Sequence, residues 1–564
     1  MRKSKKLLSL ILAVVLALAL SVTALASWNQ FQGSDSHNGV ASSTPPLSEP
    51  KPIEVDLPNS GAWTGVDAES VISNGYAYTL YNGGTDGSRL QKTNLSSATS
   101  EWNICLSSNS LNVSQLSTPY IDGTNLYAAV TYYGALTPDG DIQLDGEAVD
   151  SSFTVPEGTS TVTISGYRLP SDYRSMQIDT GINTDLTGLT ASAIIRDSAG
   201  HDYELGDSKS YGGEFIMYNV NGCRVPEADG YKLIVTFNND TGESLDSSGI
   251  DLLVPSWELY KVNTSTGTKA SVAYGRGQAN SPITSDSSSI YFGIYDGDHC
   301  FYQFPKTGTS IGDLVSYTPH DQEADFYNTG AAVVSVNGTD YAVFGCDNGN
   351  IYVRPTANFA SGSGTYITLT SASGYPTGPV RSTIVVYDDS IYFSSKGESV
   401  GLIWRIPIAE LMSNTPTVAS NYVKDARNST STPAISANGI LYVGTSYFDE
   451  NFVGRGTVQA FDASTLQYTG YRVYEGDAVQ ASPVVYGEND GTTKSDYVYF
   501  TTNSEAGAGH CYSFEENTKT STISIEHYWT AEGTSANRYA LQGFSADNGY
   551  LIYGDDGNRL YIMR

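Results

Sequence analysis

The chain has 564 residues, of which 30 are basic and 60 acidic, and its formal net charge is −30. Such a charge repels phosphate backbones and anionic lipid surfaces, so nucleic acids and membrane surfaces are not expected partners. The 56 glycines and 41 tyrosines, together with few helical periodicities, favour an all-β fold.

The N-terminus has the pattern of a secretory signal peptide. A basic cluster at residues 2–6 precedes an apolar run from Leu7 to about Leu20, and the small-x-small sequence Ala24-Leu25-Ala26 follows. A membrane anchor is the alternative, but the run is short for a span, and no later stretch is apolar enough to cross a bilayer. We therefore expect residues 1–26 to be removed and the protein to be secreted or extracellular, with cell-surface association left open. Ser27 follows the cut, so no lipid-modifiable cysteine stands there.

Cysteines and histidines are dispersed along the chain. No two cysteines are adjacent or form a CxxC pair, and an odd number cannot all be bridged within one chain. No two histidines have metal-ligand spacing, so no metal site is predicted. The residues are Cys105, Cys223, Cys300, Cys346 and Cys511, and His37, His201, His299, His320, His510 and His527.

One phrase recurs along the chain. It reads "TPYIDGTNLYAAV" at 118–130, "SPITSDSSSIYFG" at 281–293 and "TPAISANGILYVG" at 432–444. Each copy predicts a strand, a tight turn and a second strand, because Asn-Gly and Asp-Gly tolerate the positive φ of short hairpin turns. The second strands are anchored at Tyr78, Tyr127, Tyr291, Val343, Tyr392, Tyr442, Tyr499 and Ile552.

Six of the seven intervals between these anchors are 49 to 57 residues long. That length suits a four-stranded antiparallel unit, and an all-strand repeat of this size is typical of β-propeller blades. A generic β-sandwich would not repeat at this period. The anchors predict eight blades, or seven if the phrase at Val343 or Ile552 is misread. Only 12 residues follow Ile552, so Pro52–Leu57 is expected to supply the missing strand and close the ring.

Small residues precede the first strand of several repeats, at Ser117–Pro119, Ser281-Pro282, Ser431–Pro433 and Ser482-Pro483. We expect crowding near the central axis to favour small side chains there. Proline is tolerated at a strand start.

The remaining interval, from Tyr127 to Tyr291, is 164 residues and contains an insert. Period-2 alternation in segments such as "STVTISGYRL" and "YKLIVTFNN" predicts strands. We therefore expect residues 135–254 to form an inserted β-sandwich of jelly-roll or immunoglobulin-like type, within a propeller made of residues 28–134 and 255–564. A spacer and a glycan-binding module are both open as its role.

The segment "WNQFQGSDSHNGV" at 28–40, followed by the repeats, resembles the pyrrolo-quinoline quinone (PQQ)-like β-propeller family of secreted bacterial type. The resemblance implies that the N-terminal tryptophan segment packs at the base of the ring. The family usually has Arg before the glycine, where Gln32 stands here. The tryptophan that often follows the Thr-Gly turn is missing from "TGTKA" and "TGYRV".

The family includes quinoprotein dehydrogenases, which hold a quinone in the central channel beside Ca²⁺, a catalytic Asp and often a disulfide of adjacent cysteines. No adjacent cysteines occur here, and the acidic pairs Asp296/Asp298 and Asp555/Asp556 are typical of hairpin turns rather than of a cation loop. No cofactor is therefore predicted, although a PQQ- and Ca²⁺-dependent dehydrogenase remains an alternative.

A polysaccharide-active enzyme is the other alternative, but 60 carboxylates do not single out a catalytic pair. Tyr132, Tyr133, Tyr295 and Tyr447 could stack on sugars, although packing between blades is favoured. Without a catalytic constellation, we predict a monomeric, non-catalytic binding or scaffold protein. Its protein or glycan partner is expected at the propeller rim or the inserted domain, and no catalytic or cofactor-binding residue is assigned.

Overall fold

The computed structural model describes residues 28–59, 64–84, 86–107, 117–182, 187–211, 214–218, 222–319, 324–371, 374, 377–397, 400–423, 430–449, 453–503, 508–532 and 540–564. The predicted signal peptide lies outside these residues. The described chain is almost entirely β-structure, with three 3₁₀ turns at η1 (Ile311–Asp313), η2 (Thr356–Asn358) and η3 (Ile408–Glu410). Within it, no helix combines the length and apolar character that a membrane crossing requires.

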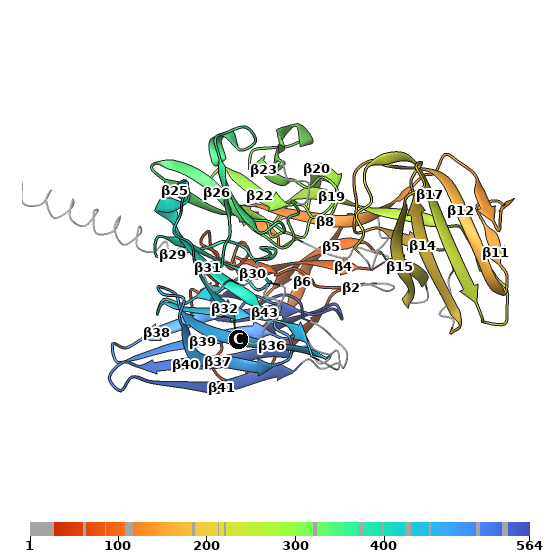
Figure 1. Cartoon of the computed structure of the whole chain (residues 1–564). Coiled ribbons are helices and arrows are strands. Elements are labelled where there is room, and N and C mark those ends of the chain that lie inside the picture. Colours follow the sequence, from red (N-terminus) through yellow and green to blue (C-terminus); the bar gives the residue numbers. More distant parts are fainter. Residues whose placement is uncertain are drawn as a thin grey trace, which may run out of the picture.

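The strands form consecutive antiparallel sheets, each of four main strands that follow one another from inner to outer edge, which is the plan of a β-propeller (Figure 1). Each predicted anchor lies in the second strand of one sheet. The first four sheets consist of β3 (Val71–Ser73), β4 (Tyr76–Gly83), β5 (Ser88–Asn94) and β6 (Thr99–Ser107), with β2 (Thr64–Gly65) paired to β4; β7 (Tyr120–Asp122), β8 (Asn125–Leu136), β19 (Asp251–Asn263) and β20 (Lys269–Arg276); β21 (Thr284–Ser285), β22 (Ser289–Gly293), β23 (Phe301–Pro305) and β24 (Val315–Tyr317); and β25 (Ala332–Val336), β26 (Thr339–Gly345), β27 (Asn350–Pro355) and β28 (Thr365–Thr368).

The second half of the ring repeats the same order. Its sheets consist of β29 (Val385–Tyr387), β30 (Ser390–Lys396), β31 (Gly401–Pro407) and β32 (Ala419–Val423); β33 (Ala434–Ile435), β34 (Ile440–Gly444), β36 (Gly454–Asp462) and β37 (Tyr468–Gly476), with β35 (Tyr447–Phe448) paired to β36; β38 (Val484–Asn489), β39 (Thr493–Thr501), β40 (Ala508–Asn517) and β41 (Thr522–Glu532); and β42 (Ser545–Asp547), β43 (Tyr550–Gly554), β44 (Arg559–Met563) and β1 (Ile53–Asp56).

The predicted pairing of the N-terminal strand with the last sheet is present. β1 runs antiparallel to β44, and Ile53 lies opposite Ile562. Chain segments about 500 residues apart in sequence thus share one sheet, and its outer edge is covered by the start of the chain.

Turn chemistry explains the first hairpin of four of the eight sheets. Both residues of Asn74-Gly75, Asn337-Gly338, Asp388-Asp389 and Asn548-Gly549 have positive φ, as a two-residue type I′ turn requires. The predicted tight turn at Asn438-Gly439 differs, because only Gly439 has positive φ and its N–H donates to the carbonyl of Ser436.

Hydrophobic clusters lie between neighbouring sheets. One cluster combines side chains of β7, β8, β19 and β20 with those of β22 and β23, and another combines β25 to β27 with β29 to β31. A further cluster joins residues of the seventh and eighth sheets to Ile72 and Ala77 of the first. Face-to-face burial between successive sheets is therefore the main source of apolar stabilisation.

Residues 28–46, which we call the strap, cross the middle of the ring. Their carbonyl oxygens accept hydrogen bonds from the innermost strands: Trp28 from Ile72 at 2.7 Å, and Gly39 from Val485 at 2.8 Å. The same pattern joins Asn29 to Ile121, Ser36 to Val386, and Asn38 to Ile435. The strap thus satisfies inner-edge N–H groups of five sheets.

The insert extends two strands of the second sheet along their length, beyond the end of the sheet (Figure 1). β8 and β19 pair along their length, from Asn125 opposite Asn263 to Leu136 opposite Leu252. The junctions predicted near residues 134 and 255 therefore lie inside two long strands. The other strands are β9 (Ile142–Leu144), β10 (Glu147–Ala148), β11 (Phe153–Val155), β12 (Gly158–Leu169), β13 (Gln177–Asp179), β14 (Leu189–Arg196), β15 (Asp202–Tyr211), β16 (Glu214–Tyr218), β17 (Ala228–Asn239) and β18 (Leu245–Ser247).

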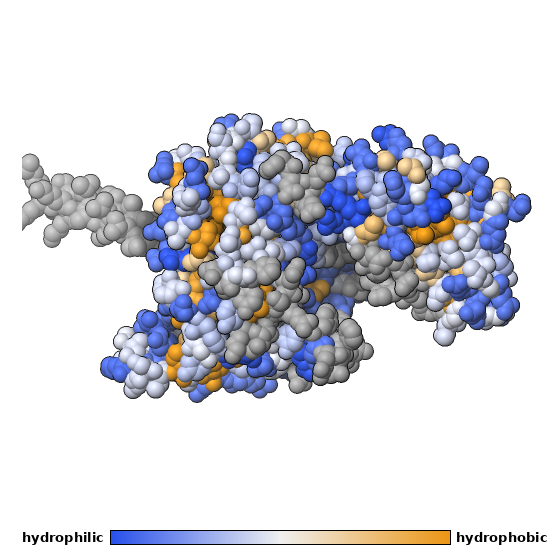
Figure 2. Space-filling view, viewed as in Figure 1, coloured by the Kyte–Doolittle hydropathy of each residue, from blue (hydrophilic) through white to orange (hydrophobic). Residues whose placement is uncertain are grey.

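A separate hydrophobic cluster forms the centre of the insert. It contains side chains of β12, β14 and β17 on one side, and of β13, β16 and β19 on the other. β14 alternates strictly between buried and partly or fully exposed residues, which matches the predicted period of two. On the outside, hydrophilic residues cover most of the face seen in Figure 2, and hydrophobic residues form separate small patches.

The strap should be a main contributor to stability, and His37 tests this. The buried ring nitrogens of His37 lie 3.0 Å from the carbonyl oxygen of Phe31 and 3.2 Å from that of Ala331. We expect His37→Ala to lower the free energy of unfolding by about 2 kcal/mol, because it leaves a cavity and removes the polar link. Denaturant unfolding at neutral pH measures this.

The control is His201→Ala, since the side chain of His201 in the insert is 76% exposed. Equal losses in the two variants would show that the strap contact at His37 contributes nothing specific.

Candidate functional site

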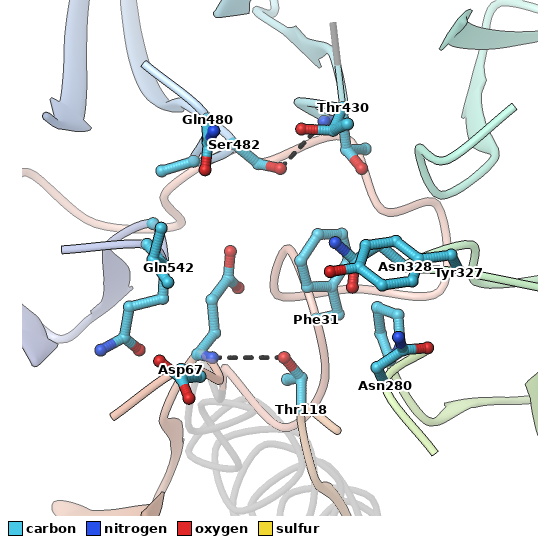
Figure 3. A pocket seen from close by; sticks show the side chains of 16 residues that line it. Phe31, Asp67, Thr118, Asn280, Tyr327, Asn328, Thr430, Gln480, Ser482 and Gln542 are labelled. Atoms are coloured by element: carbon cyan, nitrogen blue, oxygen red, sulfur yellow. Dashed lines mark hydrogen bonds between the residues drawn. The ribbon is translucent and has the colours of Figure 1, made fainter. Parts of the chain in front are cut away.

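A cavity of about 170 Å³ opens at the centre of the ring. Its walls come from the segments directly before the innermost strands of seven of the eight sheets, which brings residues far apart in sequence around one axis. Figure 3 shows labelled side chains from different sheets surrounding a central space. The lining residues with polar side chains are Asp67, Glu69, Thr118, Asn280, Tyr327, Asn328, Thr430, Thr432, Gln480, Ser482 and Gln542.

The strap contributes to the cavity through Phe31. Its neighbour Gln32 has positive φ and donates from Nε2 to Oε1 of Glu69 at 3.2 Å, while its backbone N–H donates to Oε2 at 3.4 Å. One segment therefore lines the cavity and holds a carboxyl group of its wall.

Glu69 is the most deeply buried acidic group of the cavity. Its backbone N–H donates to Oγ1 of Thr118 at 3.2 Å, which ties the first sheet to the second. Burial raises the pKa of Glu69 to about 8, and the hydrogen bonds from Gln32 only partly oppose this. At neutral pH the carboxyl group is therefore mostly protonated.

Asp67 is half-buried, two residues before Glu69. Burial, together with the negative charge of Asp556, raises the pKa of Asp67 to about 6. Within the part of the chain that the structure describes, no hydrogen bond or ion pair engages its carboxylate. Among the described residues, the cavity thus contains a carboxylate whose charge no neighbour balances.

Gln542 supplies a further acceptor. Its Nε2 donates to the carbonyl oxygen of Val66 at 3.1 Å, which fixes the orientation of the amide. Its Oε1 is buried and, among the described residues, has no hydrogen-bond partner. A buried amide oxygen without a donor destabilises the protein unless water or a ligand supplies one.

Hydroxyl groups join neighbouring sheets around the cavity. Oγ1 of Thr432 accepts from the backbone N–H of Thr383, and Oγ of Ser482 accepts from that of Thr432, both at 2.9 Å. The small residues predicted to relieve crowding at these positions therefore also carry hydrogen bonds from one sheet to the next.

A second polar cluster lies where the insert meets the third and fourth sheets. Nδ1 of His299 lies 2.5 Å from Oδ1 of Asp325, and its Nε2 lies 2.6 Å from Oδ1 of Asp172 in the insert. Arg224 of the insert also binds Asp172. Burial alone would lower the pKa of His299, but the hydrogen bonds and charges of the two aspartates raise it to about 9.

Protein groups engage the carboxyl groups of this cluster. The carboxylate of Asp296 accepts the backbone N–H groups of Arg174 and Ser175, and Arg381 forms a two-point ion pair with Asp347. The cluster is therefore a structural junction rather than a cation site.

The acidic pairs singled out in the sequence occupy turns. Asp298 accepts from the backbone N–H of Arg276 and from the hydroxyl of Tyr302, and Asp555 accepts from Gly557 and Arg559 in the β43–β44 turn. The negative charge of Asp556 helps to raise the pKa of Asp67, so Asp556 lies close to the cavity.

The tyrosines considered as sugar contacts do not line the cavity. The buried Tyr133 accepts a hydrogen bond from Gln278 at 2.8 Å, and Tyr295 packs edge-on against the lining residue Tyr327, with ring centres 5.1 Å apart. Tyr132 and Tyr447 are half-buried on β8 and β35. All five cysteines are free thiols.

The quinone that the family resemblance implies does not fit this cavity. PQQ is an anionic, carboxylate-bearing molecule, whereas the lining residues that the structure describes include Asp67 and Glu69 and no Lys, Arg or His. Burying an anion beside an unbalanced carboxylate is unfavourable. We therefore derive no redox step for this chain.

Sequence reasoning assigned none of the cavity residues. The useful signal was the position of each segment within its repeat, because residues directly before the first strands converge at the axis of a propeller. Asp67 and Glu69 stand at that position in "VDAES", as Gln542 does in "LQGFS".

The sequence matches no known family description and no curated protein. Among solved structures, the chain is similar to BamB from Moraxella catarrhalis, with 13% identity over 55% of this chain and 81% of that one, at a TM-score of 0.34. It is also similar to a europium-containing methanol dehydrogenase (10% identity, 86% and 90% covered, TM-score 0.38) and to Drosophila Semaphorin 2a (10% identity, 55% and 71% covered, TM-score 0.36). At these similarities no function is transferred from these proteins.

The junction of the insert should depend on the protonated form of His299. Because the pKa of His299 is raised from 6.5 to about 9, its contribution is fully present below pH 6.5 and is lost as pH rises through about 9. We expect His299→Gln to lower the free energy of unfolding by about 2 kcal/mol at pH 6, and by much less at pH 10. Denaturant titrations of both proteins at the two pH values measure the difference. A constant difference would show that the charge of His299 does not stabilise the junction.

Proposed function

We propose that the protein is a secreted, non-catalytic, monomeric binding protein that recognises a glycan through the cavity at the ring axis. In this proposal the eight sheets are the blades of one closed propeller, and residues 135–254 form an inserted β-sandwich. The hydrophobic clusters between successive sheets and the β1–β44 pairing support the closed ring.

The lining of the cavity is the observation that carries the proposal. Side-chain amides, hydroxyls and carboxyl groups converge there, and they can donate to and accept from the hydroxyl groups of a sugar. Phe31 and Leu541 add apolar surface for the C–H face of a pyranose ring. A volume of about 170 Å³ suits one sugar unit rather than a large cofactor.

The topology of the ring supports a role for the insert beside this cavity. The insert interrupts the second sheet between its second and third strands, and in an antiparallel meander this connection lies at the same end as the segment before the first strand. The insert therefore stands on the face where the cavity opens. A glycan held at the axis could extend along it.

A polysaccharide-active enzyme is the second candidate, and one observation favours it. The pKa values of Asp67 and Glu69, about 6 and about 8, differ as those of a general base and a general acid do. Incubation with oligosaccharides followed by chromatography of the products separates the two functions, since hydrolysis or elimination would contradict a purely binding role.

Variants of the cavity test the glycan proposal. Gln480 lines the cavity and is exposed, so Gln480→Ala should leave the fold intact and weaken binding of any glycan identified on an array by about tenfold. Titration calorimetry measures the affinity. Gln467→Ala, at an exposed turn between β36 and β37, is the matched control and should bind like the unchanged protein. Absence of glycan binding by the unchanged protein, or equal affinities of the two variants, would contradict the proposal.

A further inference from the structure

We propose that the axial cavity selects a sugar that bears a free, protonated amino group, such as a hexosamine unit that is not N-acetylated. This inference rests on the proposed glycan-binding function and names the class of sugar bound at the same site.

The first step is the excess of acceptors over donors at one wall of the cavity. The Asp67 carboxylate lacks a hydrogen bond or ion pair among the described residues, and Oε1 of Gln542 is buried without a donor there. The carboxyl group of Glu69 accepts hydrogen bonds from the backbone and the side chain of Gln32. A group with several N–H donors satisfies more of these oxygens than one sugar hydroxyl can.

The second step is charge. Among the described residues, no Lys, Arg or His lines the cavity, and Asp556 adds a further negative charge near Asp67. Arg381 lies close to the cavity, with its guanidinium 4.5 Å from the ring centre of the lining residue Tyr327. Its two-point ion pair with Asp347 already matches that charge. The described lining of the cavity therefore attracts a cation and contains no cationic side chain.

The third step is size. An alkylammonium chain needs a narrow tunnel, whereas this cavity is wide enough that residues of seven sheets line it. Amide groups at Asn280, Asn328 and Gln480 surround the remaining space and can bind the hydroxyl groups of the sugar. An amino sugar uses both the acidic wall and the neutral polar remainder.

Burial of the two carboxyl groups supports the selection. An ammonium group beside them favours their ionised forms, which opposes the rise of their pKa values to about 6 and about 8. Because Asp67 ionises between about pH 5 and pH 7, affinity for an amino sugar should increase over that range. Affinity for a neutral sugar should change little.

The test compares glucosamine, glucose and N-acetylglucosamine by titration calorimetry against the full secreted chain at about pH 6.5. We expect glucosamine to bind at least about tenfold more tightly than either neutral sugar, in keeping with hydrogen bonds to a charged group. Asp67→Asn should reduce this preference to about twofold. Asp67→Asn together with Glu69→Gln should abolish the preference.

Two exposed positions provide matched controls. Asp229→Asn in the insert and Glu49→Gln near the strap make the same chemical changes away from the cavity and should keep the full preference. Thermal unfolding of each variant establishes that it is folded before its binding is compared.

Each remaining outcome is decisive. Equal affinity for glucosamine and glucose overturns the amino-sugar inference and leaves glycan binding standing. Absence of binding to every sugar, including the oligosaccharides of an array, overturns the proposed function itself. Tighter binding of Nα-acetyl-lysine amide, whose Nζ ammonium is free, than of glucosamine would show a cation site for a protein side chain. This result would also overturn the inference.

Discussion

The backbone N–H groups on the inner edges of the sheets impose the constraint on which this structure depends. These groups face a narrow axis, where each needs an acceptor because a buried, unpaired N–H is costly. The strap supplies carbonyl oxygens to five sheets, including Ile72 of the first and Val485 of the seventh. Hydroxyl groups such as those of Thr432 and Ser482 satisfy N–H groups at the segments before the first strands. The strap, which crosses the middle of the ring, thus joins sheets that are distant in sequence.

The cavity is a consequence of the same arrangement. The strap occupies part of the axis, and Phe31 is its residue that lines the cavity. A space therefore remains where the segments before the first strands meet. Those segments carry hydroxyl and amide groups because they hold neighbouring sheets together, and the space they enclose is therefore polar. The propeller plan produces a binding site without a special loop, and its chemistry is set by a few side chains such as Asp67 and Gln542.

Most of the fold could be predicted from the sequence because its signals are local. Asn-Gly pairs mark turns with positive φ, and the eight anchors mark the second strands. The site could not be predicted in the same way. His299 and Asp172 are 127 residues apart, and Gln542 and Val66 are 476 apart, with no sequence pattern that relates either pair. Even the small residues before the first strands were interpreted through crowding, whereas their hydroxyl groups carry hydrogen bonds between sheets.

Gln32 connects the architecture to the proposed chemistry. The family that the N-terminal segment resembles usually has Arg at this position, and a guanidinium beside Glu69 would give that carboxylate a permanent counter-charge. The amide of Gln32 instead donates a neutral hydrogen bond at 3.2 Å, and burial raises the pKa of Glu69 to about 8. The strap thus keeps its structural hydrogen bond to the ring, and the described lining gives the carboxyl groups of Asp67 and Glu69 no cation. A positive charge that the protein does not supply at this site can come from a ligand, and that is why the position of one neutral side chain bears on what the cavity binds.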